Sequence, residues 1–123
     1  MAIDEIVRKP EIHPKGWGRE IWIANTLLYC GKILVLNEGK RCSIHYHKLK
    51  DETFYILKGK VEMRIWQLNE YPDNGGRFVM NPSEVLHVPP TLVHQFLGLE
   101  DSEILEVSTQ HFEEDSYRLK RGD

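Results

Sequence analysis

The chain has 123 residues, 41% of them apolar, and a net charge of −3 with acidic and basic residues interleaved. This length and composition predict one globular domain, and the charge pattern excludes the basic stripe that a nucleic-acid-binding surface needs. The longest apolar run, residues 33–36, is too short to cross a bilayer, so no membrane partner is expected.

The first ten residues and the cysteines bear on the cellular compartment. Residues 1–10 contain acids and lack the apolar segment of a secretory signal. Cys30 and Cys42 form no CxxC pair. We therefore expect reduced thiols and a cytoplasmic location.

Taken in chain order, the sequence begins with residues 1–16, whose Pro10, Pro14 and Gly16 predict an arm leading into the fold. From residue 19, short apolar-rich segments alternate with turn residues. They predict nine strands, over residues 20–23, 28–36, 42–47, 53–58, 60–67, 77–80, 84–88, 94–99 and 104–109. The polar segment 112–123 predicts a short helix or a strap.

The turns between these segments favour an all-β fold. Residues 72–76, Pro-Asp-Asn-Gly-Gly, suit a hairpin loop because Asn and Gly tolerate positive φ. The Pro89-Pro90 pair interrupts strand pairing. Many short strands at close spacing predict a sandwich or barrel, here one domain over residues 1–123 with its core at about residues 19–110.

Four residues have the types and spacing of a metal site. His45 and His47 are two apart on a predicted strand, so their side chains share a face. Glu52 follows after a polar turn, and His94 begins a later strand. Three imidazoles and a carboxylate suit one divalent transition metal, Zn, Mn, Fe, Ni or Co, and leave coordination sites open for a small-molecule substrate.

Alternation along the strand at 53–58 gives the orientation of the site. Glu52 shares a face with Phe54 and Ile56, which we predict to point into the barrel, whereas Tyr55 and Leu57 point outward. A polar cluster at one end of an apolar interior is a common layout for a ligand-holding barrel.

The remaining histidines are not predicted to be ligands. His87 lies between two apolar residues that suit the core, so it is expected to face outward. His13 and His111 lie near the chain ends. Ser43, on the ligand face, and Gln95, beside a ligand, are further pocket candidates.

The first of these segments resembles a motif of the cupin superfamily. That motif reads Gly, five residues, His-x-His, three or four residues, Glu, six residues, Gly. The sequence matches it at Gly39, His45, His47, Glu52 and Gly59. The resemblance implies a six-stranded jelly-roll β-barrel that uses the three central residues as metal ligands.

The second cupin motif is matched less closely. Pro89 and the ligand His94 agree with it, whereas Ser83, Thr91 and Gly98 stand where Gly, Gly and Asn are usual. These departures affect the expected turns and leave the ligand in place.

A narrower resemblance concerns the chain ends. Residues 13–22, HPKGWGREIW, are similar to the opening of cupins of the type II phosphomannose isomerase kind, and residues 104–119 are similar to their acidic ending. Lys50 also occurs in D-lyxose isomerase-like cupins, in which a lysine and a second glutamate assist proton transfer. The resemblance implies a metal-dependent sugar or sugar-phosphate isomerase with Lys50 and Glu106 as catalytic residues.

The residues themselves leave alternatives open. Lys50 also suits a solvated turn, and alternation alone does not say which face Glu106 occupies. The same ligands would serve an Fe-dependent dioxygenase, or a non-catalytic cupin that binds a small molecule. Four cations could bind a substrate phosphate, namely Arg41, Lys48, Lys50 and Arg64.

Large apolar side chains that are expected to face outward predict a homodimer. Tyr55, Leu57 and Trp66 present more apolar surface than a monomer normally exposes, and strand edges invite pairing.

Overall fold

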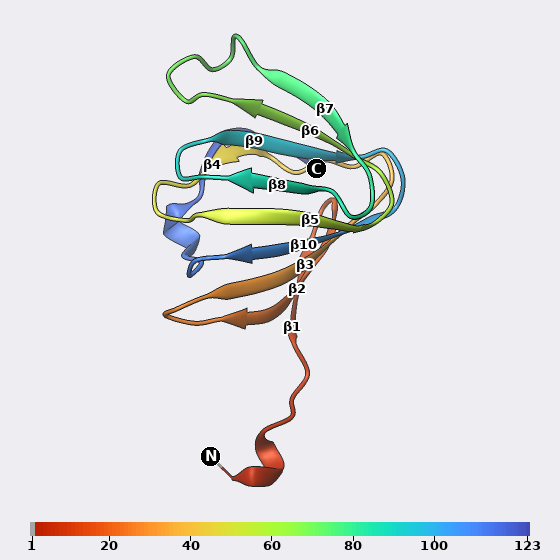
Figure 1. The fold of residues 1–123 in the computed structure, drawn as a ribbon, viewed down its shortest axis with the longest axis vertical. Helices are drawn as coiled ribbons and strands as arrows, with labels where there is room; N and C mark the ends of the chain where they lie inside the picture. The colour runs from red at the N-terminus through yellow and green to blue at the C-terminus, as the bar shows by residue number, and fades with distance from the viewer. Residues whose placement is uncertain (1) are drawn as a thin grey trace.

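The computed structural model describes residues 2–123, which form two antiparallel β-sheets facing each other around a barrel interior (Figure 1). The six-stranded sheet has the order β1 (Glu11–Lys15), β2 (Gly18–Asn25), β3 (Cys30–Leu36), β10 (Ser102–Ser108), β5 (Glu52–Lys58) and β8 (Val85–Val88). The five-stranded sheet has the order β11 (Tyr117–Lys120), β4 (Ile44–Tyr46), β9 (Val93–Gly98), β6 (Val61–Trp66) and β7 (Gly76–Met80). Strands distant in sequence pair in both sheets, as a jelly roll requires.

Helix is limited to two single turns in the part of the chain that is described. They are 3-10 helices, η1 (Ile3–Glu5) and η2 (Glu113–Asp115). No helix among residues 2–123 has the length and apolar character needed to cross a membrane. The predicted all-β fold class is confirmed.

Alternating burial divides the barrel interior into an apolar end and a polar end. Along β3, Leu34 and Leu36 are buried toward one end and Lys32 toward the other. On β10, Ile104 lies beside Leu34 and Glu106 lies beside Lys32. Register therefore aligns apolar residues with apolar residues and charged residues with charged ones across neighbouring strands.

The apolar core fills the first of these ends. It comprises Trp17, Leu34, Leu36, Cys42, Phe54, Ile56, Val61, Met63, Met80, Val88, Phe96 and Ile104. The predicted inward face of β5 is confirmed, because Phe54 and Ile56 are buried while Tyr55 and Leu57 are exposed.

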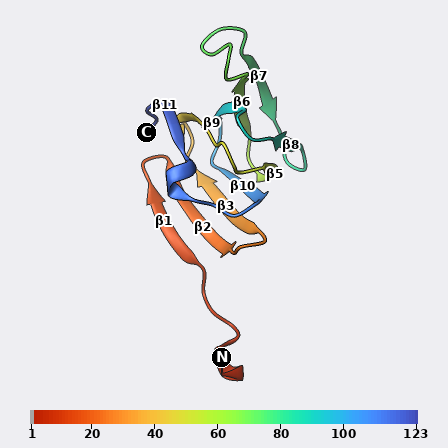
Figure 2. The same cartoon turned by 90° about the vertical axis from the view of Figure 1, so that its left-hand side faces the viewer.

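All nine predicted strands are present, as β2 to β10, but two further strands were not predicted. Residues Glu11–Lys15, expected to belong to an arm, form β1 and pair with β2. The polar tail supplies β11, which pairs with β4. Both additions are edge strands, and an edge position accommodates Pro14 because its missing amide hydrogen is not needed there. Only residues 2–10 extend away from the barrel as an arm (Figures 1 and 2).

Candidate metal centre

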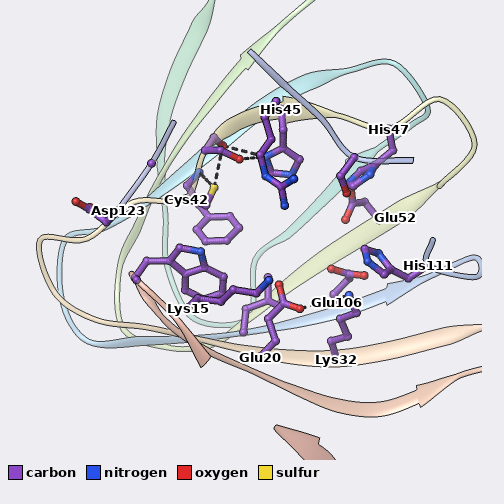
Figure 3. A pocket seen from close by; sticks show the side chains of 18 of the residues that line it. Lys15, Glu20, Lys32, Cys42, His45, His47, Glu52, Glu106, His111 and Asp123 are labelled. Atoms are coloured by element: carbon purple, nitrogen blue, oxygen red, sulfur yellow. Dashed lines mark hydrogen bonds and ion pairs between the residues drawn. The ribbon is translucent and has the colours of Figure 1, made fainter. Parts of the chain in front are cut away.

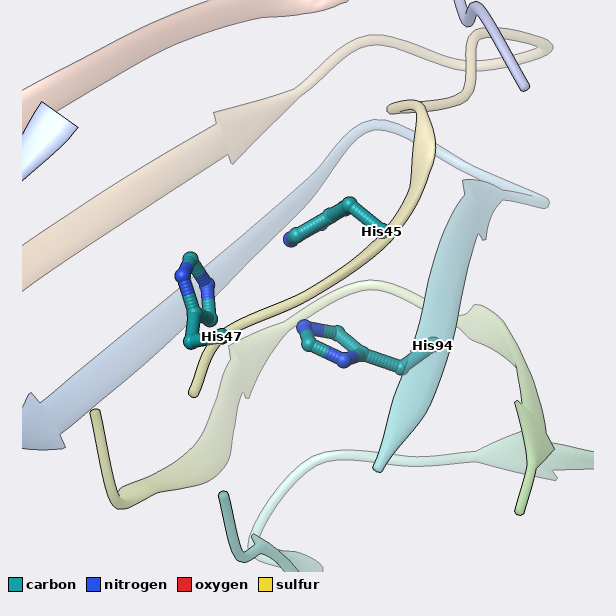
Figure 4. Close-up of side chains that lie close together, drawn as sticks. All are labelled: His45, His47 and His94. Atoms are coloured by element: carbon teal, nitrogen blue, oxygen red, sulfur yellow. The ribbon is translucent and has the colours of Figure 1, made fainter. Parts of the chain in front are cut away.

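Three histidines from neighbouring strands converge at the polar end of the barrel. His45 lies on β4, His47 directly follows β4, and His94 lies on β9. His45 and His94 are paired across the two strands. One ring nitrogen of each histidine lies within 4.8 Å of the others, an arrangement visible in Figure 4.

Backbone carbonyls orient all three imidazoles. The Nδ1 atoms of His45, His47 and His94 lie 2.9, 3.0 and 2.9 Å from the carbonyl oxygens of Ser43, Asp115 and Leu92, respectively. A carbonyl only accepts hydrogen bonds, so each Nδ1 carries the hydrogen and each Nε2 keeps a free lone pair. This tautomer is the one that ligates a metal through Nε2.

Burial also keeps these histidines neutral. Loss of solvation is the main cause that lowers the pKa of His45, His47 and His94 to about 3, and a neighbouring histidine contributes to the lowering in each case. Neutral imidazole is the ligand form, so the three side chains do not need to lose a proton before they bind a metal near neutral pH.

Glu52, the first residue of β5, lies directly beside the histidines. Its Oε2 is 3.4 Å from Nε2 of His47 and 3.4 Å from Nε2 of His94. Among the described residues, Glu52 Oε2 and His94 Nε2 are buried without a hydrogen-bond partner. Burial and the nearby Glu106 carboxylate raise the pKa of Glu52 well above its usual value.

These unpartnered atoms fit a metal ion. Two buried lone pairs facing each other are unfavourable unless a cation lies between them. Three nitrogens and one carboxylate oxygen are borderline donors that hold a divalent transition metal and select weakly among Zn, Mn, Fe, Ni and Co.

Lys50 and Glu106 lie next to this cluster. Lys50 is only 3% exposed, so it is not a solvated turn residue, and Glu106 is 3% exposed and faces inward. Their charged atoms are 2.6 Å apart, and Lys50 Nζ is 3.8 Å from Oε1 of Glu52. Lys50 Nζ also lies 3.1 Å from Nδ1 of His111.

The lysine and the glutamate hold each other in their charged forms. Burial would lower the pKa of Lys50, but the carboxylates of Glu106 and Glu52 raise it by more. Burial would raise the pKa of Glu106, but Lys50 and Lys32 lower it by more. The result is a buried ammonium and a buried carboxylate beside Glu52 and the histidine cluster.

A cavity of about 590 Å³ opens over the site. Its walls include His45, His47, Glu52 and Glu106, which Figure 3 labels. Lys50 also lines it. The volume falls within the range of small-molecule pockets.

Sequence reasoning missed several residues of this cavity. They are Lys15, Trp17, Glu20, Lys32, His111, Glu113 and Arg118. Lys32 shares the inward parity of Leu34 and Leu36 on β3, a signal that could have identified it. His111 is not part of the histidine cluster, as expected, yet it contacts Lys50.

Other candidates lie outside the cavity or serve the fold. Among the four cations considered for phosphate, only Lys50 lines the cavity, whereas Arg41, Lys48 and Arg64 do not. Ser43 lines it, but Gln95 does not, because its side-chain amide donates to the Cys42 carbonyl.

His87 is exposed, as predicted. It lies 2.6 Å from Asp51 on the outside of the barrel.

The C-terminal tail completes the site. The Asp115 carboxylate accepts hydrogen bonds from the backbone amides of Lys48, Leu49 and Lys50, and the Asp115 carbonyl orients His47. Figure 2 shows η2 and β11 crossing the side of the barrel. The C-terminal tail therefore forms part of the site.

The departures from the second cupin motif retain the glycine-like backbone. Ser83 has φ of 73° and Thr91 has φ of 74°, both left-handed. The backbone amide of Thr91 donates to the carbonyl of His47 at 2.7 Å. The turn thus still connects the segment before His94 to the first pair of ligands.

Comparison with known proteins finds one curated sequence relative. The chain is 37% identical over 59 residues to quercetin 2,3-dioxygenase of Bacillus subtilis (strain 168), a match covering 48% of this chain and 15% of the dioxygenase. No family profile matches the chain.

Solved structures resemble the whole barrel. The capsular polysaccharide assembling protein CapF of Staphylococcus aureus matches 98% of this chain and 37% of its own, with a TM-score of 0.78 and 18% identity. Oxalate decarboxylase of Bacillus subtilis matches 89% of this chain and 30% of its own, with a TM-score of 0.77 and 17% identity.

A third solved structure is matched over most of its own length. KdgF of Halomonas sp. matches 78% of this chain and 81% of its own, with a TM-score of 0.66 and 18% identity. The chain thus spans about a third of the length of the first two structures and most of the length of the third. With the histidine cluster, the two-sheet barrel and these structural likenesses together, the chain has the cupin fold, as its first motif indicated.

Proposed function

We propose that this protein is a metal-dependent isomerase of a small sugar or sugar phosphate. In this proposal His45, His47, Glu52 and His94 hold the metal. The observation that carries the proposal is the buried Lys50–Glu106 pair, 2.6 Å apart, beside Glu52 in an open cavity. Removing charged side chains from water costs free energy, so a buried ion pair in the wall of a cleft is a candidate functional site.

Aldose–ketose isomerisation requires a proton to move between adjacent carbons. The ionised Glu106 would take the proton from C2 and return it to C1, while the Lys50 ammonium would give a proton to the C1 carbonyl oxygen and recover the proton that the C2 hydroxyl loses. A divalent metal at the histidines would supply polarisation of the substrate carbonyl and hydroxyl oxygens. Glu106 can accept a proton because Lys50 keeps it ionised.

The cavity supports a polar substrate. It contains charged residues of both signs beside Trp17 and Phe54, and its volume of about 590 Å³ suits a monosaccharide-sized molecule. The likeness to a capsular polysaccharide assembling protein agrees with a carbohydrate substrate.

Deuterium exchange tests the reaction directly. Protein loaded with Mn, Zn, Co, Ni or Fe is incubated with aldoses and ketoses in D₂O, and NMR follows label at C1 and C2. Glu106→Gln should lower the exchange rate by about 10²–10⁴-fold with metal still bound. Glu103→Gln, on the outer face of the same strand, serves as the control. Metal-loaded protein that exchanges no proton in any sugar would remove the isomerase assignment.

A dioxygenase is the second candidate, favoured by the 37% identity to quercetin 2,3-dioxygenase. The same three histidines and carboxylate suit Fe with open coordination positions. This function predicts substrate-dependent O₂ uptake by Fe-loaded protein and none by Zn-loaded protein. Ligand binding without turnover in either assay would instead indicate a non-catalytic binding protein.

We also propose a cytoplasmic location. Cys30 and Cys42 are buried free thiols, a state that a reducing compartment maintains. Fractionation of cells expressing the full gene product would test this.

A further inference from the structure

Lys32 is a buried cation that the proposed reaction does not use. It lies in the middle of β3 and is only 1% exposed. In the sheet it lies opposite Trp22 on one side and Glu106 on the other. It lines the same cavity as His45, His47 and Glu52, and Figure 3 shows it on the wall across from His45 and His47.

The partners of Lys32 hold it loosely. Its Nζ is 3.5 Å from Oε1 of Glu20, at the limit of a hydrogen bond. The same oxygen accepts a much shorter bond, 2.8 Å, from the indole nitrogen of Trp22. Lys32 Nζ also lies 4.2 Å above the Trp22 ring, a cation–π contact that uses no hydrogen-bond donor.

Glu106, the neighbour of Lys32 on β10, forms its short ion pair with Lys50 and not with Lys32. Glu106 pairs with Lys50 at 2.6 Å and accepts a hydrogen bond from Ser108. An ammonium has three donors, so Lys32 retains donor capacity beside the cavity. A buried cation with unused donors is suited to bind an anion.

The charge of the site points the same way. Lys32 and Lys50 are the cations buried at this end of the barrel, and Glu20, Glu52 and Glu106 are the carboxylates around them. With a divalent metal at the histidines, these five side chains carry one excess positive charge. Asp115, a further buried carboxylate, lies outside the cavity lining and accepts hydrogen bonds from three backbone amides. A monoanionic substrate would neutralise the excess charge.

Strand spacing separates this anion site from the metal. Lys32 and Glu52 lie on β3 and β5, with β10 between them. Neighbouring strands are about 4.8 Å apart, so the two backbones are roughly 10 Å apart. An anionic group held by Lys32 therefore belongs to the end of the substrate away from the metal.

We propose that Lys32 binds the carboxylate of a hydroxy- or keto-acid, so that the cavity selects sugar acids over neutral sugars. The inference rests on the proposed function for the metal-bound end of the substrate. A single ammonium and one excess charge match a carboxylate better than a phosphate monoester, which carries nearly two charges.

Calorimetric titration of metal-loaded protein tests the inference with three probes: D-glucuronate, D-glucose and D-glucose 6-phosphate. Glucuronate should bind about tenfold to hundredfold more tightly than glucose, the usual range for a charge-assisted hydrogen bond. Lys32→Met should remove this preference, whereas Lys32→Arg should retain part of it. Lys58→Met, an exposed lysine on β5 outside the cavity, is the matched control.

A second variant changes binding in the opposite direction. Glu20→Gln keeps an oxygen for the Trp22 indole but removes the carboxylate that competes for Lys32. Glucuronate should therefore bind more tightly to this variant, by about threefold to tenfold. A misfolded protein would not gain affinity, so this result tests the inference even if Lys32→Met does not fold.

Several outcomes would overturn the inference. Equal binding of glucuronate and glucose by the unmodified protein would do so, as would tighter binding of glucose 6-phosphate than of glucuronate, or weaker glucuronate binding by Glu20→Gln. Because the readout is binding, it is independent of turnover. A Lys32-dependent preference for glucuronate without deuterium exchange would support the anion site and remove the isomerase function. Deuterium exchange without that preference would support the isomerase function and remove the anion site.

Discussion

At the scale of single residues, the candidate centre depends on where each imidazole hydrogen is placed. Three separate backbone carbonyls, from Ser43, Leu92 and Asp115, bind the Nδ1 hydrogens. The Nε2 lone pairs therefore converge, with Oε2 of Glu52 3.4 Å from those of His47 and His94. Such outer hydrogen bonds orient metal ligands and raise their basicity, which explains how a small barrel prepares the site before a metal binds.

Each proposed ligand should be required for metal binding. His45→Ala, His47→Ala, Glu52→Ala and His94→Ala should each lower metal affinity by at least about tenfold to hundredfold, because each removes one of four donors. Elemental analysis of purified variants gives the metal content. His87→Ala, on the outer face, should keep full occupancy. Full occupancy in His94→Ala would contradict the four-ligand set.

The buried histidines should also make the metal-free protein sensitive to acid. Burial lowers their pKa to about 3 in the fold, against about 6.5 in the unfolded chain. Between these values the unfolded chain binds more protons, so the histidine contribution to the free energy of unfolding falls as pH drops from about 6.5 toward 3. Urea unfolding of chelator-treated protein at pH 7, 5.5 and 4.5 measures it.

A variant isolates the histidine contribution from that of the carboxylates. His47→Asn removes one titrating group while keeping a donor for the Asp115 carbonyl. Its stability should vary less with pH than that of the unmodified protein. Identical pH dependence in the two proteins would show that His47 does not titrate as its burial implies.

At the scale of elements, Asp115 joins the C-terminal tail to the ligand loop. It is buried, and its carboxylate accepts from three consecutive backbone amides of residues 48–50. Asp115→Ala should lower the free energy of unfolding by about 1–3 kcal/mol, the cost of leaving buried donors unpaired. It should also weaken metal binding, because the loop of residues 48–50 between His47 and Glu52 loses its hydrogen-bond acceptor.

Urea unfolding and metal titration check this expectation. Glu114→Ala is the matched control, because Glu114 is the exposed neighbour of Asp115 in η2. Unchanged stability in Asp115→Ala would mean that water replaces the carboxylate without loss.

The turn at Thr91 should be strained. A β-branched residue at φ of 74° is unfavourable by roughly 1–2 kcal/mol, and glycine relieves this at some cost in chain entropy. Thr91→Gly should therefore raise the free energy of unfolding by up to about 1 kcal/mol, while the amide of residue 91 still donates to His47. Thr91→Ala should give no such gain. A Thr91→Gly protein less stable than the unmodified one would contradict the strain argument.

At the scale of the whole molecule, local and non-local features were predictable to different degrees. The nine central strands and the clustering of His45, His47 and His94 follow from alternation and motif spacing, which are written in short stretches of sequence. Positions that depend on pairing between distant segments could not be predicted from the local sequence. Lys32 meets Glu106 only through the β3–β10 register, and Asp115 reaches the ligand loop only after the tail crosses the barrel.

The edge strands were missed for a related reason. β1 and β11 are short, and β1 contains Pro14, so neither has a strong local strand signal. Each forms because an unpaired neighbour, β2 or β4, offers hydrogen-bonding groups that need partners.

The outer face of the six-stranded sheet carries a continuous apolar row. Register places one apolar residue of each strand side by side, in the order Ile12, Ile21, Ile33, Leu105, Tyr55 and Val85. Ile12 is 50% exposed, Tyr55 37% and Val85 61%. Trp66 does not contribute to this face, because it lies on β6 in the other sheet and packs against Tyr71.

We expect a homodimer formed by this apolar row. A second copy can bury the row against the same surface, as isologous dimers do, and apolar burial at about 25 cal/mol per Å² stabilises the pair. Light scattering after size-exclusion chromatography at micromolar concentration should give twice the 14.4 kDa chain mass. Tyr55→Lys, at the exposed row position on β5, should yield the monomer with metal still bound. Leu68→Lys, equally exposed but outside the row, should leave the dimer intact. An unmodified protein that elutes at 14.4 kDa would exclude the dimer, whereas a dimer unaffected by Tyr55→Lys would move the interface to another face.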